Sequence, residues 1–318
     1  MQAHMPRLPR LLWLLVSALA LGCGGGSVQA GGGGGNGGGG GTGGAGLPTP
    51  DHVFVILLEN HSFSQVIGSP SMPYLNSLAA QNSLAANYFA NVHPSIGNYF
   101  MLTTGVIEST DDAFSGTVTD DNLARALAGA GKTWKSYMES LPSPGYLGGD
   151  VLPYVRHHNP FTYFSDVRQS TAQAANIVPF SQLGADMASN ALPDFGFIAP
   201  NIRNDAHDCP SGGSACADSL KLSTADAWLQ NNIDPMIKSP AFANSLLIIV
   251  FDEGLDTDTA NGGGQVPMVM LGTHVRTAFR STTLYQHQSV LRLVLELLRV
   301  SDRPGASATA PSMAEFFQ

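Results

Sequence analysis

The sequence predicts an α/β fold in which helices cover both faces of a largely parallel β-sheet, as a three-layer sandwich. Short apolar runs of strand length alternate with longer segments whose apolar residues recur at helical spacing. The runs are continuously apolar, which is typical of strands buried on both faces of a parallel sheet. The expected strands are residues 53–58, 195–199, 246–251 and 266–271.

Helices are expected between these runs. Residues 284–298, "LYQHQSVLRLVLELL", carry the clearest helical pattern. The same spacing predicts helices over residues 73–84, over residues 122–130 before Gly131, and over residues 224–237.

The first residues of the chain are expected to direct export. Residues 1–23 begin with basic side chains, continue with the apolar run "LLWLLVSALALG" and end at Cys23, which is the pattern of a signal peptide. The tripeptide Ala-Leu-Gly before Cys23 resembles a bacterial lipoprotein processing site, where the cysteine becomes lipidated. The sequence therefore favours a periplasmic or cell-surface protein anchored to a bacterial membrane, with simple secretion as the alternative.

Residues 24–46 are mostly glycine and predict a flexible linker, which leaves residues 47–318 as one domain. The chain has 15 Lys and Arg against 24 Asp and Glu, a net charge of -9, so it lacks the basic surface that a nucleic-acid partner requires. Cys209 and Cys216 favour a small disulfide-closed loop over a metal site, because an exported protein meets oxidising conditions and no second cysteine pair exists.

Polar side chains follow three of the predicted strands. Glu59 and Asn60 follow the first strand, Asn201, Asp205 and His207 follow the second, and Asp252 and Glu253 follow the third. Because ligand sites of such sheets form beyond the carboxyl ends of the strands, these side chains are expected to meet at one edge. Adjacent carboxylates repel one another, so such a pair is easier to accept beside a cation.

Ser95 stands where a helix is expected to begin, within "HPSIGNYFMLTTG" at residues 93–105. Such a serine is most often a helix cap. The alternative is a nucleophile at a helix N-terminus, where backbone N–H groups favour a phosphate. This stretch alone leaves both interpretations open.

An ordered series of motifs resembles the bacterial phosphoesterase family, which contains secreted acid phosphatases and phosphatidylcholine-type phospholipases C. This family is part of the alkaline phosphatase-like superfamily, so the resemblance implies that fold. The matching stretches are "DHVFVILLENHSF", "MPYLNSLA", "HPSIGNY", "TWKSYMESLP", "HHNPFTYF", "PNIRNDAHD", "VFDEG" and "YQHQSVLRLV". They span nearly all of residues 47–298.

The resemblance implies a divalent metal ion of unstated identity and a serine nucleophile. The implied metal ligands are Glu59, Asn60, Ser95, Asp252 and Glu253. Ser95 would attack phosphorus to give a phosphoserine, and Asn98 would hydrogen-bond the phosphoryl group. Gly97 replaces the proline usual in this motif, and His61 replaces the usual arginine, so His61 is interpreted as a neighbour of the ligands.

Asn201 and Asp205 stand where the superfamily often holds a second metal, so they form either that site or part of a phosphate pocket. His158, His207 and His287 are expected to bind phosphate or to protonate the leaving group, since histidine titrates near neutrality. The sequence thus predicts a metal-dependent hydrolase of phosphate esters, of the acid phosphatase type. A phospholipase C and a non-catalytic surface lipoprotein are the alternatives.

Overall fold

A central sheet of eight strands organises the protein, and the computed structural model describes residues 46–318. The strands of this sheet are β1 (His52–Leu58), β2 (Ser83–Ala85), β4 (Trp134–Met138), β5 (Ile177–Pro179), β6 (Phe195–Ala199), β7 (Ser245–Phe251), β8 (Met268–Gly272) and β9 (Phe279–Ser281). Their spatial order is β5-β4-β6-β1-β7-β8-β2-β9. Two short strands, β3 (Tyr88–Phe89) and β10 (Tyr285–Gln286), pair separately. The predicted signal peptide, Cys23 and the linker up to residue 45 lie outside the described residues.

The five strands β5, β4, β6, β1 and β7 are parallel, and β8 runs antiparallel to both of its neighbours. Strand β1 lies between β6 and β7, and residues 53–58 have no exposed surface. Its register pairs Leu58 with Phe251 of β7. The residues that follow these two strands, Glu59 and Asp252, therefore leave the sheet side by side.

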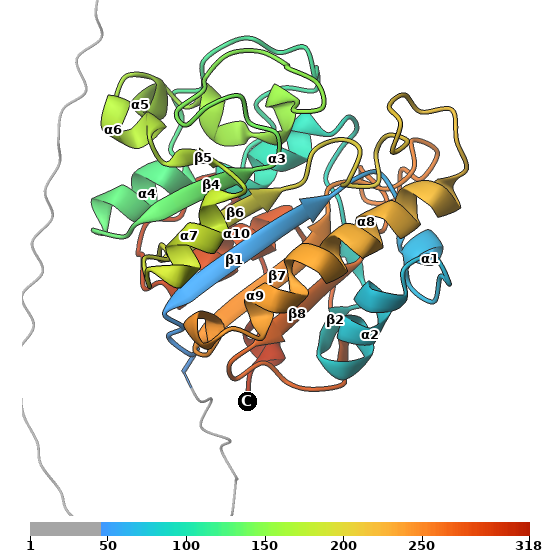
Figure 1. The fold of residues 1–318 in the computed structure, drawn as a ribbon. Helices are drawn as coiled ribbons and strands as arrows, with labels where there is room; N and C mark the ends of the chain where they lie inside the picture. Colours follow the sequence, from blue (N-terminus) through green and yellow to red (C-terminus); the bar gives the residue numbers. More distant parts are fainter. Residues whose placement is uncertain (1–45) are drawn as a thin grey trace, which may run out of the picture. The chain divides into compact units, whose positions relative to one another are not determined.

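Helices cover both faces of the sheet, as the predicted three-layer sandwich requires. They are α1 (Phe63–Val66), α2 (Pro73–Gln81), α3 (Ile96–Thr103), α4 (Leu123–Gly129), α5 (Ser165–Arg168), α6 (Thr171–Ala174), α7 (Gln182–Ala188), α8 (Asp218–Asn232), α9 (Asp234–Ile237) and α10 (His287–Leu297). Helix α8 packs against α2 and α9, and α10 packs against α3 and α4. Figure 1 shows α8 in front of the central strands and α10 behind them.

Two predicted helices are shorter than the sequence pattern indicates. The helix expected over residues 73–84 ends at Gln81, because Ser83–Ala85 form β2 between β8 and β9. The pattern at residues 284–298 begins with β10, and the helix starts at His287. In both cases residues that fit the helical pattern pair with a neighbouring strand instead.

Proline explains two other boundaries. The helix expected over residues 224–237 begins earlier, at Asp218, and is divided into α8 and α9 before Pro235, which lacks the N–H that an uninterrupted helix needs. The strand expected over residues 266–271 begins at Met268, after Pro267, and continues to Gly272.

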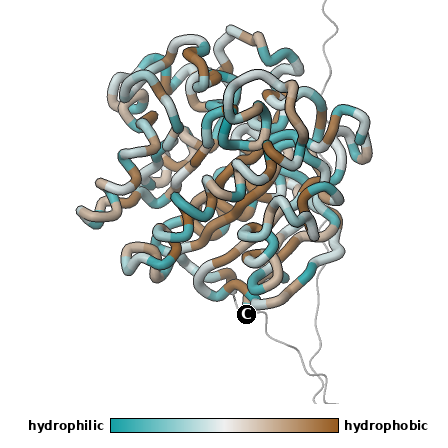
Figure 2. The backbone as a smooth tube through the Cα atoms, turned by 45° about the vertical axis from the view of Figure 1, so that its right-hand side comes forward, coloured by the Kyte–Doolittle hydropathy of each residue, from teal (hydrophilic) through white to brown (hydrophobic). Residues whose placement is uncertain are grey.

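The central strands carry the most hydrophobic residues of the described chain, and Figure 2 shows them enclosed by more polar helices and loops. A compact unit covers Ala45–Gln318. Within residues 46–318, no helix combines the length and the apolar character that crossing a bilayer requires.

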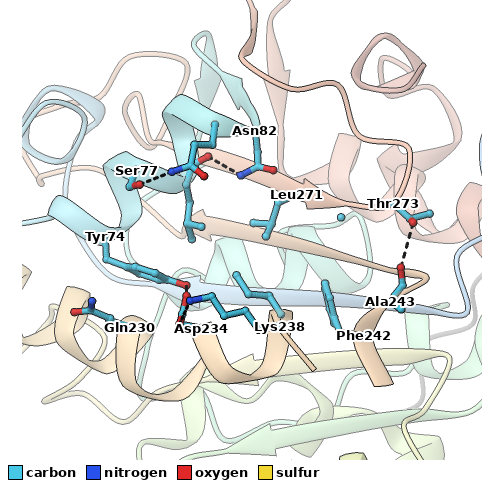
Figure 3. Close-up of a pocket in the computed structure, with 14 residues that line it drawn as sticks. Tyr74, Ser77, Asn82, Gln230, Asp234, Lys238, Phe242, Ala243, Leu271 and Thr273 are labelled. Atoms are coloured by element: carbon cyan, nitrogen blue, oxygen red, sulfur yellow. Dashed lines mark hydrogen bonds and ion pairs between the residues drawn. The ribbon is translucent and has the colours of Figure 1, made fainter. Parts of the chain in front are cut away.

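A cavity of about 650 Å3 lies at the amino edge of the parallel strands, away from Glu59 and Asp252. Its polar groups satisfy one another: Asp234 accepts hydrogen bonds from Tyr74 at 3.2 Å and from Lys238 at 2.6 Å. Figure 3 shows these three side chains together on its floor. The charges of this cavity are thus paired within the protein, unlike those at the opposite edge.

Candidate active site

The ends of β1 and β7 bring four predicted site residues together, as the sequence predicted. The backbone N–H of Asn60 donates to Asp252 Oδ1 at 3.3 Å, and Asn60 Nδ2 donates to Glu253 Oε1 at 2.9 Å. Asn60 has a φ of 37°, a left-handed conformation that asparagine tolerates better than most residues. This turn directs the amide of Asn60 back over the carboxylates rather than along the strand.

Ser95 lies at the start of α3, but its hydroxyl makes no helix-capping hydrogen bond. Instead, Ser95 Oγ lies 3.2 Å from Glu59 Oε2 and 3.2 Å from Glu253 Oε1. The side chain is almost fully buried. Of the two interpretations that the sequence left open, the geometry therefore favours the functional one.

At Gly97 in α3, the neighbouring chain leaves little space for a side chain. A Cβ atom at this position would lie 2.5 Å from Val92 Cγ1. The close approach of residue 92 thus requires a residue without a side chain here, and a proline would not fit unless Val92 moved.

Several carboxyl groups are buried close together at this edge of the sheet, so their ionised forms are unfavourable. Burial raises the pKa of Glu59 well above its usual value, and the nearby charges of Asp252 and Asp205 raise it further. The pKa of Asp252 is raised by burial and by Glu253. Burial also raises the pKa of Glu253 to about 8 and that of Asp205 to about 8. A cation among these groups would relieve the repulsion, because it favours the ionised form of each.

Unpartnered polar atoms at the same place fit a metal ion. The buried atoms without a hydrogen-bond partner among the described residues include Asn60 Oδ1, Asp252 Oδ2, Asp205 Oδ2 and both ring nitrogens of His158. Leaving such atoms unsatisfied costs about 1–3 kcal/mol each. Carboxylate and amide oxygens are the ligands that hard divalent cations prefer. The donor set therefore fits the predicted divalent metal.

His158 lies between two acidic side chains. Its Nε2 is 3.4 Å from Glu59 Oε1, and its Nδ1 is 3.3 Å from Asp205 Oδ2. One ligand atom from each of these three buried residues lies within 4.8 Å of the others, as a metal site requires. Burial lowers the pKa of His158 well below its usual value, so the ring is neutral and able to bind a cation. Asp205 thus lies in the same candidate metal cluster as Glu59.

Asn98 and His287 contact other groups than the sequence predicted. Asn98 Oδ1 accepts from the backbone of Asn91 at 2.9 Å, and its Nδ2 donates to Val92 O at 2.7 Å. His287 Nε2 lies 2.6 Å from Asp252 O. Its Nδ1 lies 3.0 Å from the hydroxyl of Tyr88. Both side chains thus hold the backbone around Ser95 and Asp252.

The remaining predicted residues lie at the margin of the site. Asn201 Nδ2 donates to Ser140, which follows β4, and its Oδ1 accepts from the backbone of Arg203 in its own loop. His207 is partly exposed and lines a pocket with Asn60 and His61. His61 is buried and donates from Nδ1 to Glu59 O at 3.0 Å. It thus contacts the backbone of a candidate ligand.

Two residues that the sequence reasoning missed also reach the carboxylates. The Tyr99 hydroxyl donates to Glu59 Oε1, and its ring stacks on His158 with centroids 5.1 Å apart. Tyr99 is four residues beyond Ser95, which places both on one helix face, so helical spacing could have identified it. His93 Nδ1 lies 2.8 Å from Glu253 Oε2, and together with Asp256 it forms a second candidate cluster of metal-binding groups.

A disulfide joins Cys209 and Cys216, with Cα atoms 5.9 Å apart. It closes the loop between Asp205 and α8. This pairing is the one that the sequence predicted.

The fold is similar to that of solved proteins of the alkaline phosphatase superfamily. A solved alkaline phosphatase superfamily protein from Vibrio parahaemolyticus aligns with a TM-score of 0.59 at 15% identity, covering 83% of this chain and 71% of that one. The lipoteichoic acid synthase LtaP of Listeria monocytogenes aligns with a TM-score of 0.58 at 12% identity, covering 81% and 74%. At these identities the likeness shows the fold alone.

The chain belongs to the Phosphoesterase family, whose model matches residues 69–301. It is 32% identical over 275 residues to the phosphatidylinositol-3-phosphatase of Mycobacterium tuberculosis, covering 85% of this chain and 84% of that protein. It is 29% identical to a probable acid phosphatase of Kluyveromyces lactis and to an acid phosphatase of Aspergillus fumigatus. The aligned region covers 56% and 53% of these two fungal proteins. The chain is therefore a phosphoric ester hydrolase, and the predicted enzyme class is confirmed.

Proposed function

We propose that this protein is a metal-dependent phosphomonoesterase that uses Ser95 as its nucleophile. The observation that carries the proposal is the Ser95 hydroxyl, which lies between two buried carboxylates instead of capping α3. The phosphatase names of the relatives support a monoester substrate over the phosphodiester of a phospholipase C.

Glu59, Asn60, Ser95, Asp252 and Glu253 would hold the metal, as the sequence predicted, and His158 with Asp205 would complete its surroundings. When bound, a divalent cation lowers the pKa of the serine hydroxyl and neutralises charge on the phosphoryl oxygens.

The residues of the chain supply the proton transfers. In the first step the Ser95 Oγ–phosphorus bond forms while the bond from phosphorus to the ester oxygen breaks. The hydroxyl proton of Ser95 passes to Glu59 or Glu253, whose carboxylate oxygens it already faces. The departing alcohol oxygen takes a proton from His207, the partly exposed histidine at the pocket beside Asn60.

In the second step water attacks phosphorus, and the bond from phosphorus to Ser95 Oγ breaks. Inorganic phosphate leaves, and Ser95 regains a proton from the carboxyl group that accepted it. His207, now neutral, takes the proton of the attacking water. Both histidine and serine are thus restored.

Hydrolysis of p-nitrophenyl phosphate by the purified protein tests this function. Ser95→Ala is expected to lower the rate by at least about a thousandfold, because the residue forms the covalent bond. Ser181→Ala is the matched control, since Ser181 also precedes a helix without capping it and is exposed. Release of choline phosphate from phosphatidylcholine without monoester hydrolysis would contradict the proposal in favour of a phospholipase C.

We also infer that the enzyme is exported and held at a bacterial membrane through a lipidated Cys23. The basic and apolar start of the sequence and the glycine-rich stretch of residues 24–46 support this inference. A flexible tether of this kind would let the catalytic domain reach substrates away from the membrane surface.

A further inference from the structure

A pocket of about 430 Å3 adjoins the candidate active site, and Asn60 lines it. Its walls come from the end of β1, from the loop closed by the Cys209–Cys216 disulfide with the start of α8, and from the turn after Glu253. A substrate whose phosphorus meets Ser95 must place its alcohol portion beside the metal ligands. This pocket is therefore suited to the leaving group.

The buried wall of the pocket presents a hydrogen-bond acceptor. His61 Nδ1 faces a backbone carbonyl oxygen, which can only accept, so this nitrogen carries the ring proton. In the neutral ring the other nitrogen, Nε2, is then an acceptor. His61 is 2% exposed, and Nε2 has no hydrogen-bond partner among the described residues. Such an atom at a pocket wall indicates a ligand group that donates a hydrogen bond.

The open side of the pocket adds more acceptors than donors. Asp218 and Asp256 contribute carboxylates, and Asp218 Oδ1 lies 3.9 Å from His61 Nε2. Lys221 contributes the one ammonium group of the lining and makes no ion pair with any residue in 46–318. A leaving group with its own negative charge would meet two carboxylates here. An uncharged alcohol with several hydroxyls would satisfy all of these groups, because a hydroxyl both donates and accepts.

We propose that this pocket recognises a cyclic polyol, so that the enzyme prefers phosphate monoesters of polyhydroxylated ring alcohols. Leu255, which is 37% exposed, supplies an apolar surface against which the C–H face of such a ring can pack. Asp218, Lys221 and His61 are specificity residues that contact the hydroxyls and take no part in bond breaking. This inference rests on the proposed phosphomonoesterase function and adds its substrate class.

Two esters of the same ring size separate hydroxyl recognition from ring packing: inositol 1-phosphate and cyclohexyl phosphate. The wild-type enzyme is expected to show at least about tenfold higher kcat/KM for the inositol ester. Asp218→Ala should lower this preference about tenfold, and Lys221→Met should lower it at least threefold. The matched controls are Asp234→Ala and Lys238→Met, an acid and a lysine of the opposite cavity, which should leave the preference unchanged.

Equal kcat/KM values for the two esters in the wild-type enzyme would overturn the inference. It would also be overturned if Asp218→Ala and Lys221→Met lowered both values to the same degree, since this would indicate damage to the site. Should Asp218→Ala fail to fold, Lys221→Met carries the test. If the wild-type protein hydrolyses p-nitrophenyl phosphate without discriminating the ring esters, only the pocket inference fails. If it hydrolyses none of the three, the proposed function fails as well.

Discussion

At the scale of single residues, the site depends on side chains whose position the backbone alone does not determine. Ser95 occupies the usual place of a helix cap, yet its hydroxyl turns to Glu59 and Glu253. Asn98 has the opposite outcome, because its amide binds the loop in front of the helix rather than a free pocket. Residue type and spacing identified both positions, but only tertiary contacts show that the Ser95 hydroxyl faces carboxylates and that the Asn98 amide binds backbone.

Asn98→Ala should therefore act first on stability. The substitution removes buried hydrogen bonds to Asn91 and Val92, and we expect the free energy of unfolding to fall by about 2–3 kcal/mol. Denaturant unfolding measures this change, with Asn231→Ala on the exposed side of α8 as control. An enzyme of unchanged stability that has lost only phosphate affinity would contradict this account and restore the phosphoryl-binding role predicted from the sequence.

A divalent cation should stabilise the folded protein as well as activate it. Glu59, Asp252 and Glu253 repel one another while buried, and a bound cation removes that repulsion. At a hundredfold excess over Kd, binding adds about 2.7 kcal/mol, which raises Tm by about 5–10 °C. Calorimetry of chelator-treated protein before and after metal addition measures the shift.

Glu59→Gln should abolish most of this metal-dependent rise in Tm, whereas Asp121→Asn on the surface should not. A wild-type Tm that is the same with and without every divalent cation tried would exclude the metal site.

At the scale of elements, the long buried strands could be predicted and the short ones could not. Strands β1 and β7 are continuous apolar runs, and such runs are stable only between two covered faces. Strands β2 and β9 have three residues each, too few to show a periodic pattern. Strand β2 pairs with β8 and β9, which lie far from it in the sequence, so a local sequence window does not contain its partners. The site was predictable to the extent that it follows the long strands, as Glu59 and Asp252 do.

Helix α7 is fixed to β4 by a single carboxylate. Asp186 of α7 accepts hydrogen bonds from Lys135 at 2.6 Å and from Tyr137 at 2.7 Å. Burial raises the pKa of Asp186, but the hydrogen bonds from Lys135, Tyr137 and Gln182 outweigh this, so its pKa lies below the usual value. The ionised form is thus stabilised by folding, and its contribution is present above the unfolded-state pKa of about 3.9.

Asp186→Asn should lower the free energy of unfolding by about 1–3 kcal/mol at neutral pH. The difference from wild type should shrink as pH falls below about 4 and through the lowered pKa of Asp186, where the carboxylate takes up a proton. Urea titrations from pH 7 to pH 3 measure the difference. A difference that stays constant over this range would show that the charge of Asp186 is not what joins the helix to the strand.

At the scale of the whole molecule, the described fold and the proposed export and anchoring signals occupy separate parts of the sequence. The described residues hold the sheet, both helical layers and the site, whereas the export and anchoring predictions rest on residues 1–46. With a net charge of -9, the protein is not attracted electrostatically to an anionic lipid surface. A covalent anchor at Cys23 avoids that difficulty.

Cys23→Ser should release the exported enzyme from the membrane. In bacteria expressing the full chain, we expect phosphatase activity to move from the membrane fraction to the soluble fraction, because a serine cannot carry the lipid. Cys209→Ser is the control, since it removes a cysteine of the catalytic domain, together with its disulfide to Cys216, and leaves Cys23 in place. Membrane-bound activity that persists in Cys23→Ser would indicate a different form of attachment.

A search for the proposed phosphoserine at Ser95 is the most direct test of the mechanism. The purified enzyme would be mixed with p-nitrophenyl phosphate, quenched in acid within the first turnovers, digested and analysed by mass spectrometry. We expect a phosphate on the Ser95 hydroxyl in the wild-type enzyme, and neither that modification nor phosphate release in Ser95→Ala. Hydrolysis at the wild-type rate by Ser95→Ala would contradict the account, and so would a phosphate carried by another residue of the site.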